Sequence, residues 1–238
     1  MAHFIRYLTA TLVLWLAPAS IAETRPGPQP LRQVTFTVFS AQPVVGLAYE
    51  PTTGAAPRAV IFYPTARSPG YNHHGPAPLK FFNVASGEVM AEVTLPSRVR
   101  ALLLIFTPND NPGSGVLPYR VQMVTDDVSA HATGTLKILN LTGMKLTGAI
   151  NGRQVELVSG FNEPIRVDGT AVIELRTPFR NRSYQAYAET IAVGRAGRGL
   201  LVLLPPYRRG SLEVQSRVLV DDPAPARTRP ESGRLLVD

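Results

Sequence analysis

Arginine and aromatic side chains are interleaved in the last third of the chain. One turn-like segment carries Tyr207, Arg208 and Arg209 in succession. A second carries Arg180 and Arg182. A guanidinium group binds carboxylate, sulfate or phosphate through paired hydrogen bonds and also stacks on aromatic rings. These five residues are therefore the predicted ligand-binding residues, for an anionic glycan, a lipid headgroup or a nucleic acid.

The opposing interpretation is that arginines on loops and strand edges keep the surface soluble and prevent aggregation. The same two interpretations, anion binding and a soluble surface, apply to a wider basic-aromatic set in the same part of the chain. Its further members are Arg176, Arg195, Arg198, Phe179, Tyr184 and Tyr187.

Two adjacent histidines are weak candidates for a metal site. His73 and His74 lie in the stretch 64–78, whose many prolines and glycines predict a long loop. Imidazole binds transition metals, but neighbouring histidines rarely chelate one ion, and the chain has no cysteine to complete a site. The sequence therefore predicts no metal and no cofactor, with both histidines solvated in a flexible loop.

No set of residues predicts catalysis. Ser114 lacks the flanking pattern of a nucleophile elbow, and no glycine-rich phosphate loop precedes a helix. The pairs Asp126-Asp127 and Asp221-Asp222 offer oxygen ligands for calcium, although two aspartates at a strand end usually just end the strand. We therefore predict that the protein is not an enzyme.

The elements that must position these residues form two copies of one pattern. The segment 32–127 recurs, with substitutions and a shorter middle, as 134–222. Each copy closes with an apolar run, a turn and a last strand that ends in paired aspartates. A period of about 100 residues is far longer than that of solenoid repeats, so each copy is expected to be a domain with its own core.

Apolar and polar residues alternate within each copy, which is the period of a half-buried strand. Asn151-Gly152 is the strongest hairpin signal, because both residues tolerate the positive φ of a two-residue turn. The 22 prolines and 19 glycines leave little room for a long helix. The predicted fold is all-β, with two tandem antiparallel β-sandwich domains of the immunoglobulin-like class that arose by internal duplication.

Residues 1–22 have the composition of a secretory signal peptide. Arg6 precedes an apolar run at 8–16, and Ser20-Ile21-Ala22 is a small-residue cleavage site. The run is shorter than the roughly 20 residues that span a bilayer, so no transmembrane anchor is expected. The protein should be periplasmic or secreted after cleavage near Ala22. The remaining segments are a proline-rich linker at 23–31, a linker at 128–133 and a disordered tail at 223–238.

The formal net charge is +7 at pH 7, and most of the excess lies in the second copy, with twelve basic and eight acidic residues. A basic surface favours anionic partners. The predicted partners are a protein or an anionic polysaccharide of the cell envelope, with no specific nucleic acid. Because there is no cysteine, the exported chain must be stabilised by its core.

Taken together, these features predict an exported, non-catalytic protein with a binding or structural role at the cell envelope. In outline the chain is similar to the periplasmic chaperones of pilus assembly, which are basic, have two immunoglobulin-like domains and hold clients by strand addition. This resemblance covers architecture only and carries over no residue. It implies a chaperone-like protein as one alternative, with a long strand of the first copy left unpaired. An anionic glycan-binding module is the other alternative.

Overall fold

The chain forms strands and no helix throughout the part that the structure describes. The computed structural model describes residues 31–109, 111–113, 115–127 and 129–221. The predicted signal peptide, the predicted tail, Ser114 and Asp222 lie outside these residues. The all-β prediction is confirmed, and no described segment is a helix long and apolar enough to cross a membrane.

The N-terminal half, 31–127, has two four-stranded sheets whose arrangement is consistent with a β-sandwich. The outer sheet has the order β3-β2-β5-β6 and the inner sheet the order β4-β1-β7-β8. The outer strands are β2 (Leu47–Tyr49), β3 (Arg58–Ala59), β5 (Leu79–Asn83) and β6 (Val89–Val93). The inner strands are β1 (Arg32–Ser40), β4 (Tyr71–Gly75), β7 (Ala101–Pro108) and β8 (Tyr119–Thr125).

The C-terminal half, 129–221, repeats this arrangement. Its inner sheet has the order β12-β9-β16-β17, with β13 also paired to β9, and its outer sheet has the order β11-β10-β14-β15. The inner strands are β9 (Thr135–Asn140), β12 (Gly160–Phe161), β13 (Ile165–Arg166), β16 (Arg198–Leu204) and β17 (Gln215–Asp221). The outer strands are β10 (Leu146–Ile150), β11 (Arg153–Leu157), β14 (Thr170–Phe179) and β15 (Arg182–Ala192).

The prediction of purely antiparallel sheets is wrong at one pairing in each half. β1 pairs with β7 in parallel, from Thr35 opposite Ala101 to Ser40 opposite Phe106. β9 pairs with β16 in the same way. Between the two paired strands the chain passes through the outer sheet, which is the long connection that parallel pairing requires.

The predicted hairpin at Asn151-Gly152 is confirmed. It joins β10 to β11, with φ of 49° at Asn151 and 76° at Gly152. The Asn151 side chain also secures the neighbouring strand, because its Oδ1 accepts a hydrogen bond from the Val172 N–H at 2.7 Å. A second two-residue turn, Arg180-Asn181 between β14 and β15, was not predicted, because its positive φ values occur without glycine.

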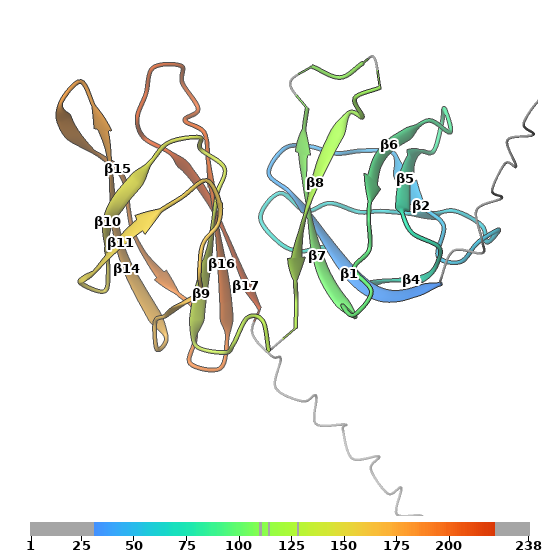
Figure 1. The fold of residues 1–238 in the computed structure, drawn as a ribbon, viewed down its shortest axis with the longest axis horizontal. Coiled ribbons are helices and arrows are strands. Elements are labelled where there is room, and N and C mark those ends of the chain that lie inside the picture. Colours follow the sequence, from blue (N-terminus) through green and yellow to red (C-terminus); the bar gives the residue numbers. More distant parts are fainter. Residues whose placement is uncertain (1–30, 110, 114, 128, 222–238) are drawn as a thin grey trace, which may run out of the picture.

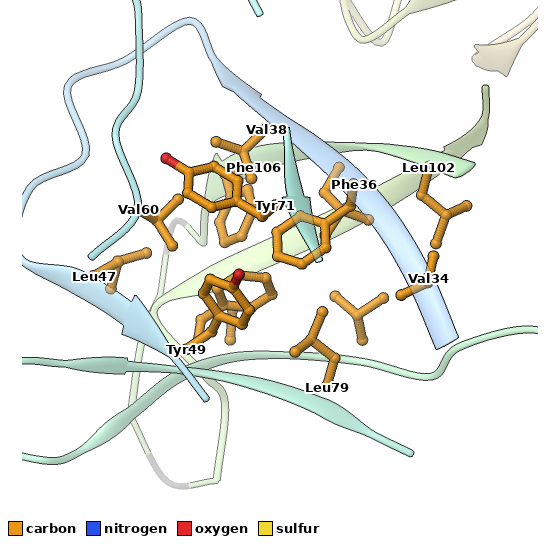
Figure 2. Close-up of a cluster of buried hydrophobic side chains, with 14 of the residues drawn as sticks. Val34, Phe36, Val38, Leu47, Tyr49, Val60, Tyr71, Leu79, Leu102 and Phe106 are labelled. Carbon is orange, nitrogen blue, oxygen red and sulfur yellow. The ribbon is translucent and has the colours of Figure 1, made fainter. Parts of the chain in front are cut away.

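Two apolar clusters each lie within one half. In the N-terminal half the cluster is rich in aromatic rings (Figure 2), and Phe36 meets the edge of Tyr49 at a centroid distance of 5.1 Å. Tyr71 of β4 stacks against Phe36 at 5.5 Å. The C-terminal cluster is built mainly from aliphatic side chains, among them Leu136, Ile173 and Leu201.

A third apolar cluster, the interface cluster, joins the two inner sheets. Every one of its eight side chains is at most 3% exposed. Its members are Phe39, Leu103, Ile105 and Val124 of the N-terminal half with Leu139, Leu200, Val202 and Leu219 of the C-terminal half. The four sheets therefore form one stack, with the two inner sheets facing each other at its centre (Figure 1). Separate cores were predicted for the two copies, but this shared cluster was not.

Gly148 tests the close packing of the C-terminal outer sheet. A Cβ at this position would lie 1.9 Å from the carbonyl oxygen of Glu174 on β14, so the backbones would have to separate. We expect Gly148→Ala to lower the free energy of unfolding by about 1–3 kcal/mol in urea denaturation. Gly70→Ala is the control, because its nearest neighbouring atom would be 4.0 Å away. Equal urea midpoints for the two variants would contradict the close approach.

Candidate functional site

The β16–β17 loop presents the strongest of the predicted binding residues to solvent. Tyr207, Arg208 and Arg209 are all exposed, and 86% of the Tyr207 surface is accessible. Gln215 at the start of β17 donates a hydrogen bond to the Pro205 carbonyl at 2.9 Å, which fixes the base of the loop. The three side chains therefore project from an anchored loop.

The β14–β15 hairpin carries the other two predicted residues at the same end of the C-terminal half (Figure 1). Arg180 lies over the Phe179 ring at 5.2 Å from its centroid, and Arg182 is exposed. The edge of β15 reaches the β16–β17 connection, because the Val214 N–H donates to the Ala186 carbonyl at 3.0 Å. All five predicted residues are thus exposed, on one loop and one hairpin, at the same end of the C-terminal half.

The wider basic-aromatic set does not form one surface. Arg198 and Tyr187 are buried, with 8% and 6% of their surface exposed. The Tyr187 hydroxyl donates a hydrogen bond to Glu189 at 2.6 Å, and burial raises the pKa of Tyr187. Arg176 is hydrogen-bonded to Ser183.

The prediction that the two histidines are solvated in a flexible loop is wrong. His73 and His74 lie on β4, which pairs with β1, so their side chains point to opposite faces of a sheet. His73 is buried, and its Nδ1 is 3.0 Å from the Glu50 carbonyl oxygen. His74 is exposed. The two rings cannot share one ion, and the described residues include no cluster of three or more potential metal ligands from His, Cys, Asp and Glu.

An ionic network closes one end of the interface between the halves. Asp126 accepts a 2.6 Å contact from Arg67 and a 3.4 Å contact from Arg198. Arg198 also pairs with Asp221 at the end of β17. One aspartate of each pair that suggested a calcium site, Asp126 and Asp221, is therefore held by guanidinium groups, and Arg198 links the ends of the last strands of both halves.

His131 lies beside this network, in the segment that joins the halves. It is 1% exposed, and its backbone N–H donates to the Asp127 carbonyl at 2.9 Å. Burial lowers the pKa of His131, and the positive charges of Arg198, Lys137 and Arg67 lower it further. The folded protein therefore favours the neutral imidazole.

A groove of about 500 Å³ opens at the other end of the interface. One wall carries Arg120 and Gln122 of β8, and the other carries Gln215 and Arg217 of β17. Tyr207 stands at the rim, so one predicted residue belongs to the groove. Sequence reasoning missed the wall residues, although their spacing of two along each last strand places them on one face.

Comparison with known proteins assigns no family to this chain. No protein-family model matches it. No curated protein sequence matches it either.

Arg198 tests the contribution of the ionic network. We expect Arg198→Met to lower the free energy of unfolding by about 3 kcal/mol, because Asp126 and Asp221 lose a shared counter-charge in a half-buried site. Arg166→Met is the control, because in its ion pair with Asp168 the side chains are 79% and 72% exposed. Chemical denaturation measures the free energy of unfolding of both variants. Similar decreases in the two variants would contradict a special role for the network.

His131 predicts a specific pH dependence of stability. Its pKa is lower in the folded protein than the value of 6.5 expected in the unfolded chain, so the unfolded state binds more protons as the pH falls below about 6.5. We expect the free energy of unfolding to decrease between pH 7 and pH 5.5, and His131→Gln to reduce this decrease while His73 and His74 remain. Urea midpoints across this range measure it, and an unchanged slope in the variant would contradict the assignment.

Proposed function

We propose that the protein is an exported, non-catalytic protein with a binding or structural role at the cell envelope. The main support is the joining of the two halves by the interface cluster, with the ionic network at its closed end. A four-sheet stack of this kind holds the loops of both halves in fixed relative positions. Binding residues are disproportionately found on loops that a rigid scaffold positions.

The chemistry of the groove supports a non-catalytic role. Its described walls hold arginine, glutamine and apolar side chains, together with Thr107 and Tyr207. Neither a histidine nor a carboxylate is among these residues, and those are the groups that most often transfer protons in catalysis. The groove is therefore better suited to holding a ligand than to converting one.

The sheet edges favour this role over the chaperone alternative. Strand addition would need a long unpaired strand in the N-terminal half with exposed, alternating apolar residues. The described edge strands there are β3, β4, β6 and β8. β3 has two residues, β4 and β6 have five each, β6 carries Glu92 in an ion pair with Lys80, and β8 contributes Val124 to the interface cluster. Short and charged edges of this kind protect sheets from pairing with other chains.

We also infer that the two halves are diverged copies of one immunoglobulin-like module. Strand order and the parallel pairing match between them. The interface cluster supports this origin, because the two halves contribute equivalent positions to it. Phe39 pairs with Ile105 as Leu139 pairs with Val202, and Leu103 pairs with Val124 as Leu200 pairs with Leu219. Such self-complementary contact is typical of an isologous dimer interface.

An anionic glycan-binding module is the second candidate. The exposure of Tyr207, Arg208 and Arg209 on one anchored loop favours it. An aromatic ring next to guanidinium groups can contact a sugar ring and its acidic substituents together.

The location of the protein tests the first proposal. In the organism that encodes the chain, we expect the mature protein to fractionate with the cell envelope and its first residue to follow Ala22. N-terminal sequencing and immunoblotting of cell fractions measure this. A cytoplasmic protein that retains residues 1–22 would contradict an envelope role.

A further inference from the structure

The surfaces of β8 and β17 that face the interface change character along their length. Alternate residues of a strand share a face, so four positions on each strand line this interface. The order is ionic, apolar and then polar toward the groove on both strands. The positions are Val124, Gln122 and Arg120 on β8 with Asp126 directly after its last residue, and Asp221, Leu219, Arg217 and Gln215 on β17.

Charge in the groove has a single sign. Of the described residues that line it, Arg120 and Arg217 are the charged ones, and they come from opposite walls. Gln122 of β8 is the counterpart of Arg217 on β17, since Ile105 pairs with Gln122 as Val202 pairs with Arg217, and two residues earlier on each strand Arg120 is the counterpart of Gln215. Each wall therefore offers one guanidinium group and one amide. Guanidinium groups bind acidic groups, and amides both donate to and accept from hydroxyl groups.

Two polar atoms of these walls lack partners. Gln122 Oε1 and Arg217 Nε are buried, and no described residue forms a hydrogen bond with either. Buried polar atoms in folded proteins are nearly always hydrogen-bonded. The first atom needs a donor and the second needs an acceptor. A ligand that carries both hydroxyl and acidic groups offers the matching donor and acceptor once these two side chains turn toward the groove.

The rim adds an aromatic surface. Tyr207 is 86% exposed and follows Pro205 and Pro206, which also line the groove. A ring presented in this way can pack against the apolar face of a sugar while its hydroxyl stays hydrated. The volume of about 500 Å³ is within the range of ordinary small-ligand sites.

We propose that this groove binds a segment of an acidic oligosaccharide, with Arg120 and Arg217 holding its carboxylate or sulfate groups and Tyr207 packing on a sugar ring. This inference rests on the proposed binding role at the envelope and specifies its ligand. It differs from binding at the exposed arginines alone, because the groove residues come from both halves of the chain.

Calorimetric titration of the mature protein tests the proposal with three probes. These are a heparin hexasaccharide, which carries sulfate and carboxylate, a galacturonate hexamer, which carries carboxylate alone, and neutral maltohexaose. We expect one or both acidic probes to bind and maltohexaose not to bind. The combined change Arg120→Gln and Arg217→Gln should weaken binding at least tenfold. Tyr207→Ala, at an exposed position with little effect on folding, should also weaken it.

Matched variants separate the groove from general basic charge. Arg208→Ser with Arg209→Ser removes the same charge from the loop tip, and Arg153→Gln with Arg195→Gln removes it from exposed sites elsewhere in the C-terminal half. Losses confined to the groove variants would support the proposal. A loss confined to the loop-tip variant would overturn the groove assignment while leaving glycan binding in place.

Three further outcomes would overturn the proposal. If the wild-type protein binds neither acidic probe, the ligand proposal is overturned. The proposed envelope location would be unaffected, because cell fractionation and N-terminal sequencing test it separately. Equal loss in all the arginine variants would indicate nonspecific attraction. Tighter binding of an oligothymidylate than of either acidic probe would identify a nucleic-acid groove instead.

Discussion

Burial of the second face of each inner sheet is the constraint on which the rest of the structure depends. β7 and β16 each bury one face against their own outer sheet and the other in the interface cluster. Separating the halves would return eight buried apolar side chains to water, at a cost of roughly 25 cal/mol for each Å² exposed. The relative position of the halves, and with it the groove, is therefore set by apolar contact.

The two ends of this interface differ because the interface-facing side chains of β8 and β17 change from ionic to apolar to polar along the strands. At one end Asp126 and Asp221 meet Arg198, whose charge they share, and the halves are drawn together. At the other end Arg120 and Arg217 line opposite walls of the groove, and neither forms an ion pair with a carboxylate of the described residues, so the sheets leave room for a ligand. One end thus stabilises the assembly, while the other is available for recognition.

Local elements followed directly from local sequence. The Asn151-Gly152 hairpin formed as its φ preferences require, and the alternating run at 34–38 lies within β1. β4 was missed because the prolines and glycines around it masked the alternation of Tyr71, His73 and Gly75, all of which are buried. The apolar run at 102–106 was recognised as a strand, but its lack of alternation was the available sign that both faces are buried.

By itself, the sequence determined the all-β class, most of the strands and the exposure of the Tyr207, Arg208 and Arg209 loop, because each depends on neighbours a few residues away. Only the tertiary structure decided that Arg198 is an interface residue and that Arg120 and Arg217 line one groove. Those contacts join strands from opposite halves of the chain. Their geometry is set by the packing of one inner sheet on the other, and the order of residues along a strand does not specify which strand of the other half will lie opposite it.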